Sequence, residues 1–86
     1  MTPREMQAES ERSWGTRVFQ RREELHLTQE QVAELAQIDR SIVSRIEANR
    51  TVPRFRTMVS IAKALGTTVD ELFPMIAHPQ RMRRVA

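Results

Sequence analysis

Four side chains that can hydrogen-bond to nucleic-acid bases share one face of a short predicted helix: Arg40, Ser41, Ser44 and Arg45. We expect this face, which also carries Ile42, to point outward, because Val43 and Ile46 fall on the opposite side. An arginine fork can bind O6 and N7 of a guanine, and a helix of this size can enter the major groove of duplex DNA. These residues therefore favour the reading of bases.

A local basic stripe continues beyond these four side chains. Between Asp39 and position 56 only one further acid, Glu47, accompanies five arginines: Arg40, Arg45, Arg50, Arg54 and Arg56. The formal net charge of the whole chain is only +3, so the stripe is a feature of placement and not of composition. Such a stripe is typical of a surface that binds phosphate groups. We expect Arg50, Arg54 and Arg56 to contact the DNA backbone.

Two short amphipathic helices joined by a tight turn must position this face. Thr28 is the predicted N-cap of the first helix, and Gln31 completes a capping box. Asp39 is the predicted N-cap of the second, which ends at Ala48 and Asn49. The inner positions are small or apolar: Val32, Ala33, Ala36, Ile38, Val43 and Ile46. This spacing is typical of a helix-turn-helix, although similar helix pairs occur in proteins that bind no nucleic acid.

The flanking segments predict three further helices. The first spans about 13–25, with Trp14, Val18 and Leu25 on its inner face. Another follows Pro53, and its inner face is nearly continuous: Phe55, Met58, Val59, Ile61, Ala62 and Leu65. A last turn, from Val69 to Phe73, is capped by Thr67 or Thr68.

No segment has the period of a strand, so the predicted fold is all-α, with five short helices. Residues 13–73 form the domain, 1–12 an N-terminal arm and 74–86 a basic tail that contains Arg81, Arg83 and Arg84.

Composition limits the alternatives. A chain of 86 residues is expected to form one domain, and no stretch approaches the roughly 18 apolar residues of a membrane span. No signal peptide is visible, and the chain contains no cysteine, so no disulfide or thiolate metal site is possible. His26 and His78 stand alone, without acidic partners at the spacing of metal ligands. We expect no metal, no cofactor, no enzymatic activity, no membrane partner and a cytoplasmic location.

With these elements in place, the chain resembles the Cro/CI-type (xenobiotic-response-element) helix-turn-helix family of phage and bacterial repressors. Three motifs carry the resemblance: R-x-x-x-L-x-L-T-Q-E-Q-V-A at 21–33, D-R-S-I-V-S-R-I-E at 39–47, and A-K-A-L-G-T-T-V-D-E-L-F at 62–73. In two places the sequence departs from the family pattern, because Gln37 and His26 stand where glycine is common. At Gln37, either a non-glycine residue adopts positive φ or the turn opens slightly.

The resemblance implies roles for several residues. The helix at about 40–48 would be the recognition helix, with Arg40, Ser41, Ser44 and Arg45 facing base edges. Gln29 matches a glutamine that contacts a phosphate and braces the recognition helix, and we place Thr28 beside it on the DNA backbone. Arg54 matches an arginine that lies near the minor groove.

Two interactions between elements are also expected. Arg22 lies on the apolar side of its helix and there needs a carboxylate, and the family pairs this position with that of Glu47. The apolar run at the end of the predicted domain suggests a homodimer contact formed by Leu72, Phe73, Met75 and Ile76. Such a dimer would place two recognition helices about 34 Å apart on double-stranded DNA.

The sequence therefore predicts a sequence-specific DNA-binding transcriptional regulator of the repressor type. The alternative is an antitoxin or protein-interaction module of the same fold whose main partner is another protein, such as a toxin.

Overall fold

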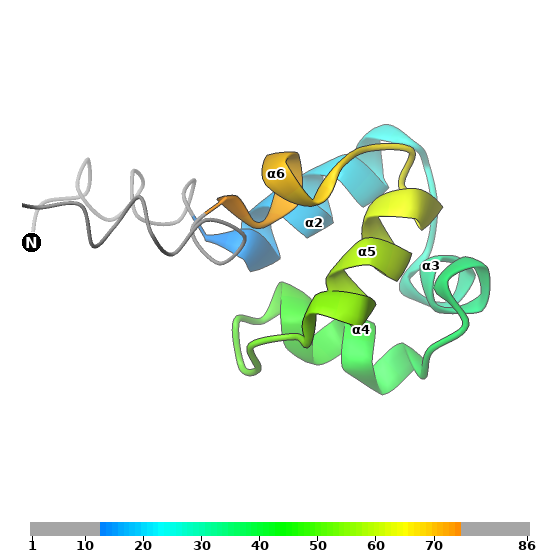
Figure 1. Cartoon of the computed structure of the whole chain (residues 1–86). Coiled ribbons are helices and arrows are strands. Elements are labelled where there is room, and N and C mark those ends of the chain that lie inside the picture. The colour runs from blue at the N-terminus through cyan, green and yellow to red at the C-terminus, as the bar shows by residue number, and fades with distance from the viewer. Residues whose placement is uncertain (1–12, 75–86) are drawn as a thin grey trace, which may run out of the picture.

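A computed structural model describes residues 13–74 of the chain. Its ordered elements are five helices, in the order α2 Trp14–Glu24, α3 Gln29–Ala36, α4 Arg40–Glu47, α5 Phe55–Ala64 and α6 Val69–Leu72 (Figure 1). No strand occurs among the described residues. The prediction of an all-α fold is confirmed.

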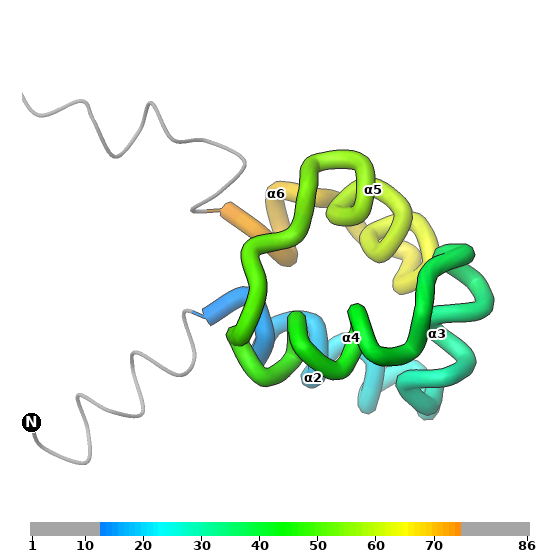
Figure 2. The backbone as a smooth tube through the Cα atoms, turned by 90° about the horizontal axis from the view of Figure 1, so that it is seen from below, coloured from blue at the N-terminus to red at the C-terminus, as the bar shows by residue number. Residues whose placement is uncertain are grey.

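The helices surround one apolar core. α3 packs against α4 and α5, α2 packs against α4 and α6, and α5 packs against α6. Seen from below, the backbone forms a ring of helices, with α2 and α4 on one side and α5 and α6 on the other (Figure 2). The largest side chains of the core come from α2, α3, α4, α5 and the segment after α6: Val18, Val32, Val43, Ile46, Met58, Ile61, Leu65 and Phe73. Removal of this apolar surface from water is the main force that holds the short helices together.

Three of the five helices described have an N-terminus that is capped by a side chain. Ser13 accepts a hydrogen bond from the Thr16 amide at 3.1 Å, and Thr68 accepts one from the Glu71 amide at 3.2 Å. Thr28 and Gln31 form the complete capping box that the sequence predicts. Asp39 occupies the predicted N-cap position of α4, although its side chain makes no capping hydrogen bond. Its extended backbone, with ψ of 143°, still begins the helix.

Three of the helix ends are closed by a non-glycine residue in the left-handed conformation. His26, Gln37 and Asn49 have φ of 57°, 58° and 57°, and Gly66 has φ of 64°. Gln37 therefore adopts the strained conformation in place of the family glycine, and the turn between α3 and α4 stays tight. Each such residue costs about 1 kcal/mol relative to an unstrained backbone.

Two residues that the sequence places on inner faces are exposed. Phe55 is 65% exposed because α5 begins there, and Pro53, two residues earlier, is the residue that is buried. Leu25 is 38% exposed because α2 ends at Glu24 and the chain turns at that point. The apolar periodicity of a segment does not show at which residue its helix begins or ends, so it cannot predict that these two side chains are exposed.

Candidate nucleic-acid interface

α4 presents its polar face to solvent. Arg40, Ser41 and Arg45 are exposed, Ser44 is half-buried, and the two inner apolar residues of the helix, Val43 and Ile46, are fully buried. The four side chains assigned to base reading thus lie on the side of α4 away from the core. The prediction that Ile42 points outward needs correction, because this side chain is half-buried and packs against the core.

A buried ion pair joins α2 to the end of α4. Arg22 donates two hydrogen bonds to the Glu47 carboxylate, from Nε to Oε2 at 2.7 Å and from Nη2 to Oε1 at 2.9 Å. Only 10% of the Arg22 side chain and 6% of the Glu47 side chain are exposed. The hydrogen bond to Glu47 raises the pKa of Arg22 above its already high ordinary value, against the opposing effect of burial. The guanidinium is therefore charged in neutral solution.

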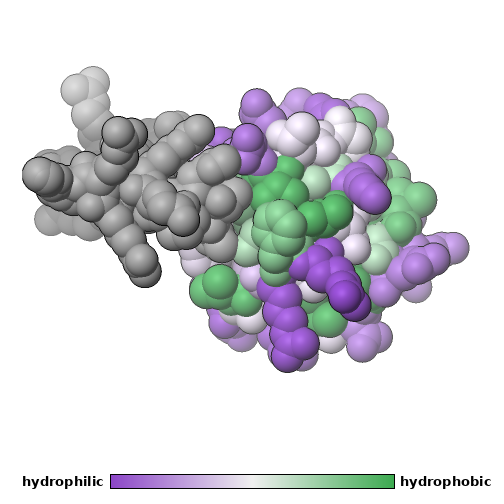
Figure 3. Space-filling model, viewed as in Figure 1, coloured by the Kyte–Doolittle hydropathy of each residue, from purple (hydrophilic) through white to green (hydrophobic). Residues whose placement is uncertain are grey.

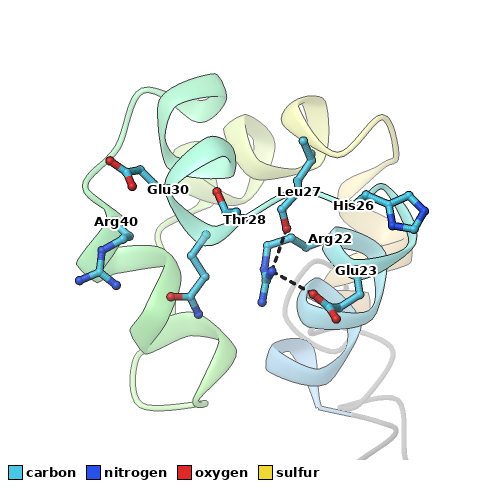
Figure 4. A pocket seen from close by; sticks show the side chains of 8 residues that line it. Arg22, Glu23, His26, Leu27, Thr28, Glu30 and Arg40 are labelled. Carbon is cyan, nitrogen blue, oxygen red and sulfur yellow. Dashed lines mark hydrogen bonds and ion pairs between the residues drawn. The ribbon is translucent and has the colours of Figure 1, made fainter.

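Other groups complete the hydrogen bonding of Arg22. Its Nη1 donates to the Leu27 carbonyl at 2.8 Å and to Glu23 Oε2 at 3.2 Å, as the dashed lines in Figure 4 show. The guanidinium carbon also lies 5.3 Å from the centre of the Phe19 ring, within the range of a cation–π interaction. Arg22 thus connects α2 to the turn that leads into α3.

Gln29, in the first turn of α3, joins the same network. Its Nε2 donates to Glu47 Oε1 at 3.1 Å, so the carboxylate of Glu47 accepts bonds from both α2 and α3. This contact braces α4 against α3, and a second N–H of the same amide is available for another acceptor. The three helices are fixed relative to one another at the end of α4.

A second contact between α2 and α4, which sequence reasoning missed, depends on Gly15. Its amide donates to Asn49 Oδ1 at 3.0 Å. A Cβ atom at this position would lie 2.5 Å from the Glu47 carbonyl oxygen and 2.7 Å from that of Ile46. Only glycine permits this approach of the two backbones. A glycine inside a helical period was the available signal, since glycine is unfavourable there without a packing reason.

The residues assigned to the DNA backbone near α3 line an open groove of about 630 Å³. It lies between the end of α2, the start of α3 and the start of α4 (Figure 4). Thr28 and Gln29 line it together with Glu30 and Arg40, and Figure 4 shows Arg40 and Glu30 at one end, away from His26. The structure thereby brings two residues assigned to the backbone next to one assigned to base reading.

Two arginines of the loop lie on the other side of α4, and a third follows in the first turn of α5. Arg50 and Arg54, in the loop, and Arg56, in α5, are all exposed. Arg54 and Arg45 line a common hollow of about 220 Å³ between α4 and the loop, so a residue that the sequence assigns to base reading and one that it assigns to the DNA backbone are again neighbours. The outer surface of α4 therefore has candidate backbone contacts on both sides.

The residues assigned to a dimer contact are placed differently from the expectation. Leu72 is 3% and Phe73 1% exposed, and both belong to the core of the domain. They have almost no surface to offer a second copy while the domain is folded. Met75 and Ile76 lie outside the described residues, as do the N-terminal arm and the tail arginines.

A short donor-bearing helix, braced by the preceding helix across a tight turn, defines a helix-turn-helix domain. The helix-turn-helix family model matches residues 18–72, which is more than half of the chain. The protein belongs to this Cro/CI-type family of DNA-binding transcription regulators, as the resemblance implied. No curated protein matches the sequence. Within residues 13–74, no helix has both the length and the apolar character that crossing a membrane requires.

Proposed function

We propose that the protein is a sequence-specific regulator of the repressor type that inserts α4 into the major groove of double-stranded DNA. One observation carries the proposal. α4 exposes Arg40, Ser41 and Arg45 on one side, while its end is held by Glu47 in hydrogen bonds to α2 and α3. A rigidly held helix with an outward row of donors suits the reading of base edges, because the side chains need little reorganisation on binding.

The arginines divide by position into base readers and backbone anchors. Arg45 is exposed one turn along α4 from Ser41 and can present both arms of its fork to O6 and N7 of a guanine. Arg50 and Arg54 lie in the loop after α4, where their contacts would go to phosphates and carry no sequence information. Gln29 would contact a phosphate with its second N–H while it continues to brace Glu47.

A second copy on a two-fold DNA site is part of the proposal. One α4 contacts only a few base pairs, so two copies with their reading helices about 34 Å apart would give the discrimination that a regulator needs. The proposed location is the cytoplasm, where the duplex is accessible.

Selection of bound sequences from a random duplex pool tests the proposal. We expect enrichment of one half-site, repeated with two-fold symmetry, and binding that weakens steeply with salt. Lys63→Ala is the matched control, because it removes an exposed cation from the last turn of α5, which runs upward away from α4 in Figure 1. The control should enrich the same sequence. Absence of any enriched sequence, together with binding that does not depend on salt, would refute the proposal and favour a protein partner.

A further inference from the structure

The hollow between α4 and the loop that follows it combines charged and apolar groups. Arg45 and Arg54 supply its positive charge, Ile42 and Pro53 contribute apolar surface, and none of the residues that line it is acidic. Figure 3 shows the same mixture on a larger scale, with apolar side chains lying among strongly hydrophilic ones over α5 and the loop before it. A partner that fits this hollow must therefore offer both negative charge and an apolar group.

Ile42 is the apolar residue of the hollow that belongs to α4 itself. Its side chain is half-buried and packs against the core, and the part that remains exposed lines the hollow. Arg45 lies three residues further along α4, and side chains at this spacing are neighbours on a helix surface, with Cβ atoms about 5–6 Å apart. Because the core holds Ile42, its side chain loses little conformational freedom in a contact with DNA.

Double-stranded DNA offers both kinds of group at this place. Phosphates and the edge of a guanine satisfy exposed arginines, but they give no apolar contact to Ile42. Among the groups that base edges present in the major groove, the 5-methyl group of thymine is the apolar one. A thymine methyl group against Ile42 would use the apolar part of the hollow while Arg45 binds a guanine beside it.

The spacing along α4 indicates where this thymine lies. Successive bases of one strand are separated by about 3.4 Å along the duplex axis. The 5–6 Å between neighbouring side chains on a helix therefore corresponds to about one or two base pairs. The thymine is expected within that distance of the guanine that Arg45 binds.

We propose that Ile42 determines specificity by contacting the 5-methyl group of a pyrimidine one or two base pairs from the guanine that Arg45 binds. In unmodified DNA this pyrimidine is thymine, and 5-methylcytosine presents the same methyl group. The inference rests on the proposed function. It adds an apolar contact to the four polar side chains that the sequence assigns to base reading.

The first test removes only the methyl group from the DNA. In the duplex obtained by selection, each thymine within two base pairs of that guanine is replaced by deoxyuridine. We expect the parent protein to bind about fourfold more weakly at one position, the effect of one methyl group on apolar burial. Deoxyuridine in the flanking sequence outside the site is the control and should have no effect. At the same position, 5-methylcytosine should bind better than cytosine by a similar factor.

The second test assigns the effect to Ile42. Ile42→Ala should bind the thymine and deoxyuridine duplexes equally, and the ratio of the two affinities is measured on the same preparation, so a partial loss of folded protein cancels. Ile42→Val, which removes one methylene group and costs the core little, should give an intermediate ratio. Leu35→Ala is the matched control, because Leu35 is an apolar residue of α3 with 59% exposure, and it should keep the ratio of the parent.

Three results would overturn the inference. The first is a selected site with no thymine within two base pairs of the guanine. The second is equal binding of the thymine and deoxyuridine duplexes by the parent. The third is a ratio that stays unchanged in the Ile42 variants or falls equally in Leu35→Ala. Failure of the selection to enrich any sequence would instead overturn the proposed function, and the inference with it.

Discussion

Removal of the Glu47 carboxylate should strongly destabilise the domain, because it leaves the buried guanidinium of Arg22 without its main partner. In Glu47→Ala, Arg22 loses two hydrogen bonds of 2.7 and 2.9 Å, and Gln29 loses its contact at 3.1 Å. Arg22 then keeps its bonds to the Leu27 carbonyl and to Glu23, so its charge is only partly compensated in a site where 10% of the side chain is exposed.

The expected loss is about 3 kcal/mol, at the lower end of the 3–5 kcal/mol typical for breaking a buried ion pair, because these two bonds remain. A domain of this size has a total stability of roughly 4–13 kcal/mol, so the variant should be folded but marginal. The loss corresponds to a fall in Tm of roughly 12–24 °C. Thermal unfolding followed by circular dichroism measures it, and urea unfolding gives the free energy independently.

Glu24→Ala is the matched control. Glu24 lies 3.9 Å from Arg21 and 66% of its side chain is exposed, so screening by solvent leaves its removal nearly neutral. The double variant Arg22→Met with Glu47→Leu should recover much of the lost stability, because it removes both charges and leaves apolar side chains of similar volume. A Tm of Glu47→Ala within two degrees of the parent, or equal losses for the two glutamates, would show that the pair does not hold α4 in place.

Three further changes test other parts of the structure. Gly15→Ala should lower stability by about 2–3 kcal/mol in urea unfolding, because its Cβ would lie 2.5 Å from a backbone oxygen; an unchanged midpoint would mean that α2 can withdraw from α4 without cost. Gln37→Gly should raise stability by up to about 1 kcal/mol, since glycine adopts φ of 58° without strain, and a lower Tm would contradict this. Arg45→Ala should cost roughly 1–3 kcal/mol on the selected site and relax one base position, whereas Arg50→Ala or Arg54→Ala should weaken all sequences alike and reduce the salt slope by about one; uniform weakening by Arg45→Ala would place the reading head elsewhere.

Local sequence signals located the helices of this protein well. Thr28 and Gln31 form the predicted capping box, and α4 ends as predicted before Asn49, which has the left-handed conformation. Both features depend only on residues that lie within about one helical turn of each other. They can therefore be predicted from the sequence without knowledge of the tertiary structure. The inward positions of α4, Val43 and Ile46, follow from period alone and are fully buried.

The ends of apolar faces were harder to predict. Phe55 has the right spacing for the inner face of α5 but lies at its first position and is exposed, whereas Pro53, two residues earlier, is buried. Leu72 and Phe73 were assigned to a dimer contact, yet the core of one copy buries them. An apolar residue near a domain boundary has the same sequence pattern whether it packs into the core or stays on the surface. Only the volume left by the other helices decides which of the two occurs.

The sequence by itself determined the all-α class, the helix-turn-helix spacing and the face of α4 that carries arginine and serine, because each depends on period and on residues close in the chain. The hold on that face was indicated only by the family resemblance, for Gln29 and for the pair of Arg22 with Glu47, and in the case of Gly15 and Asn49 by tertiary structure alone. Gly15 and Asn49 are 34 residues apart, and Gln29 and Glu47 are 18 apart. Their contacts exist because core packing brings α2, α3 and α4 to a common point, and no local pattern specifies where three helices of this length will meet.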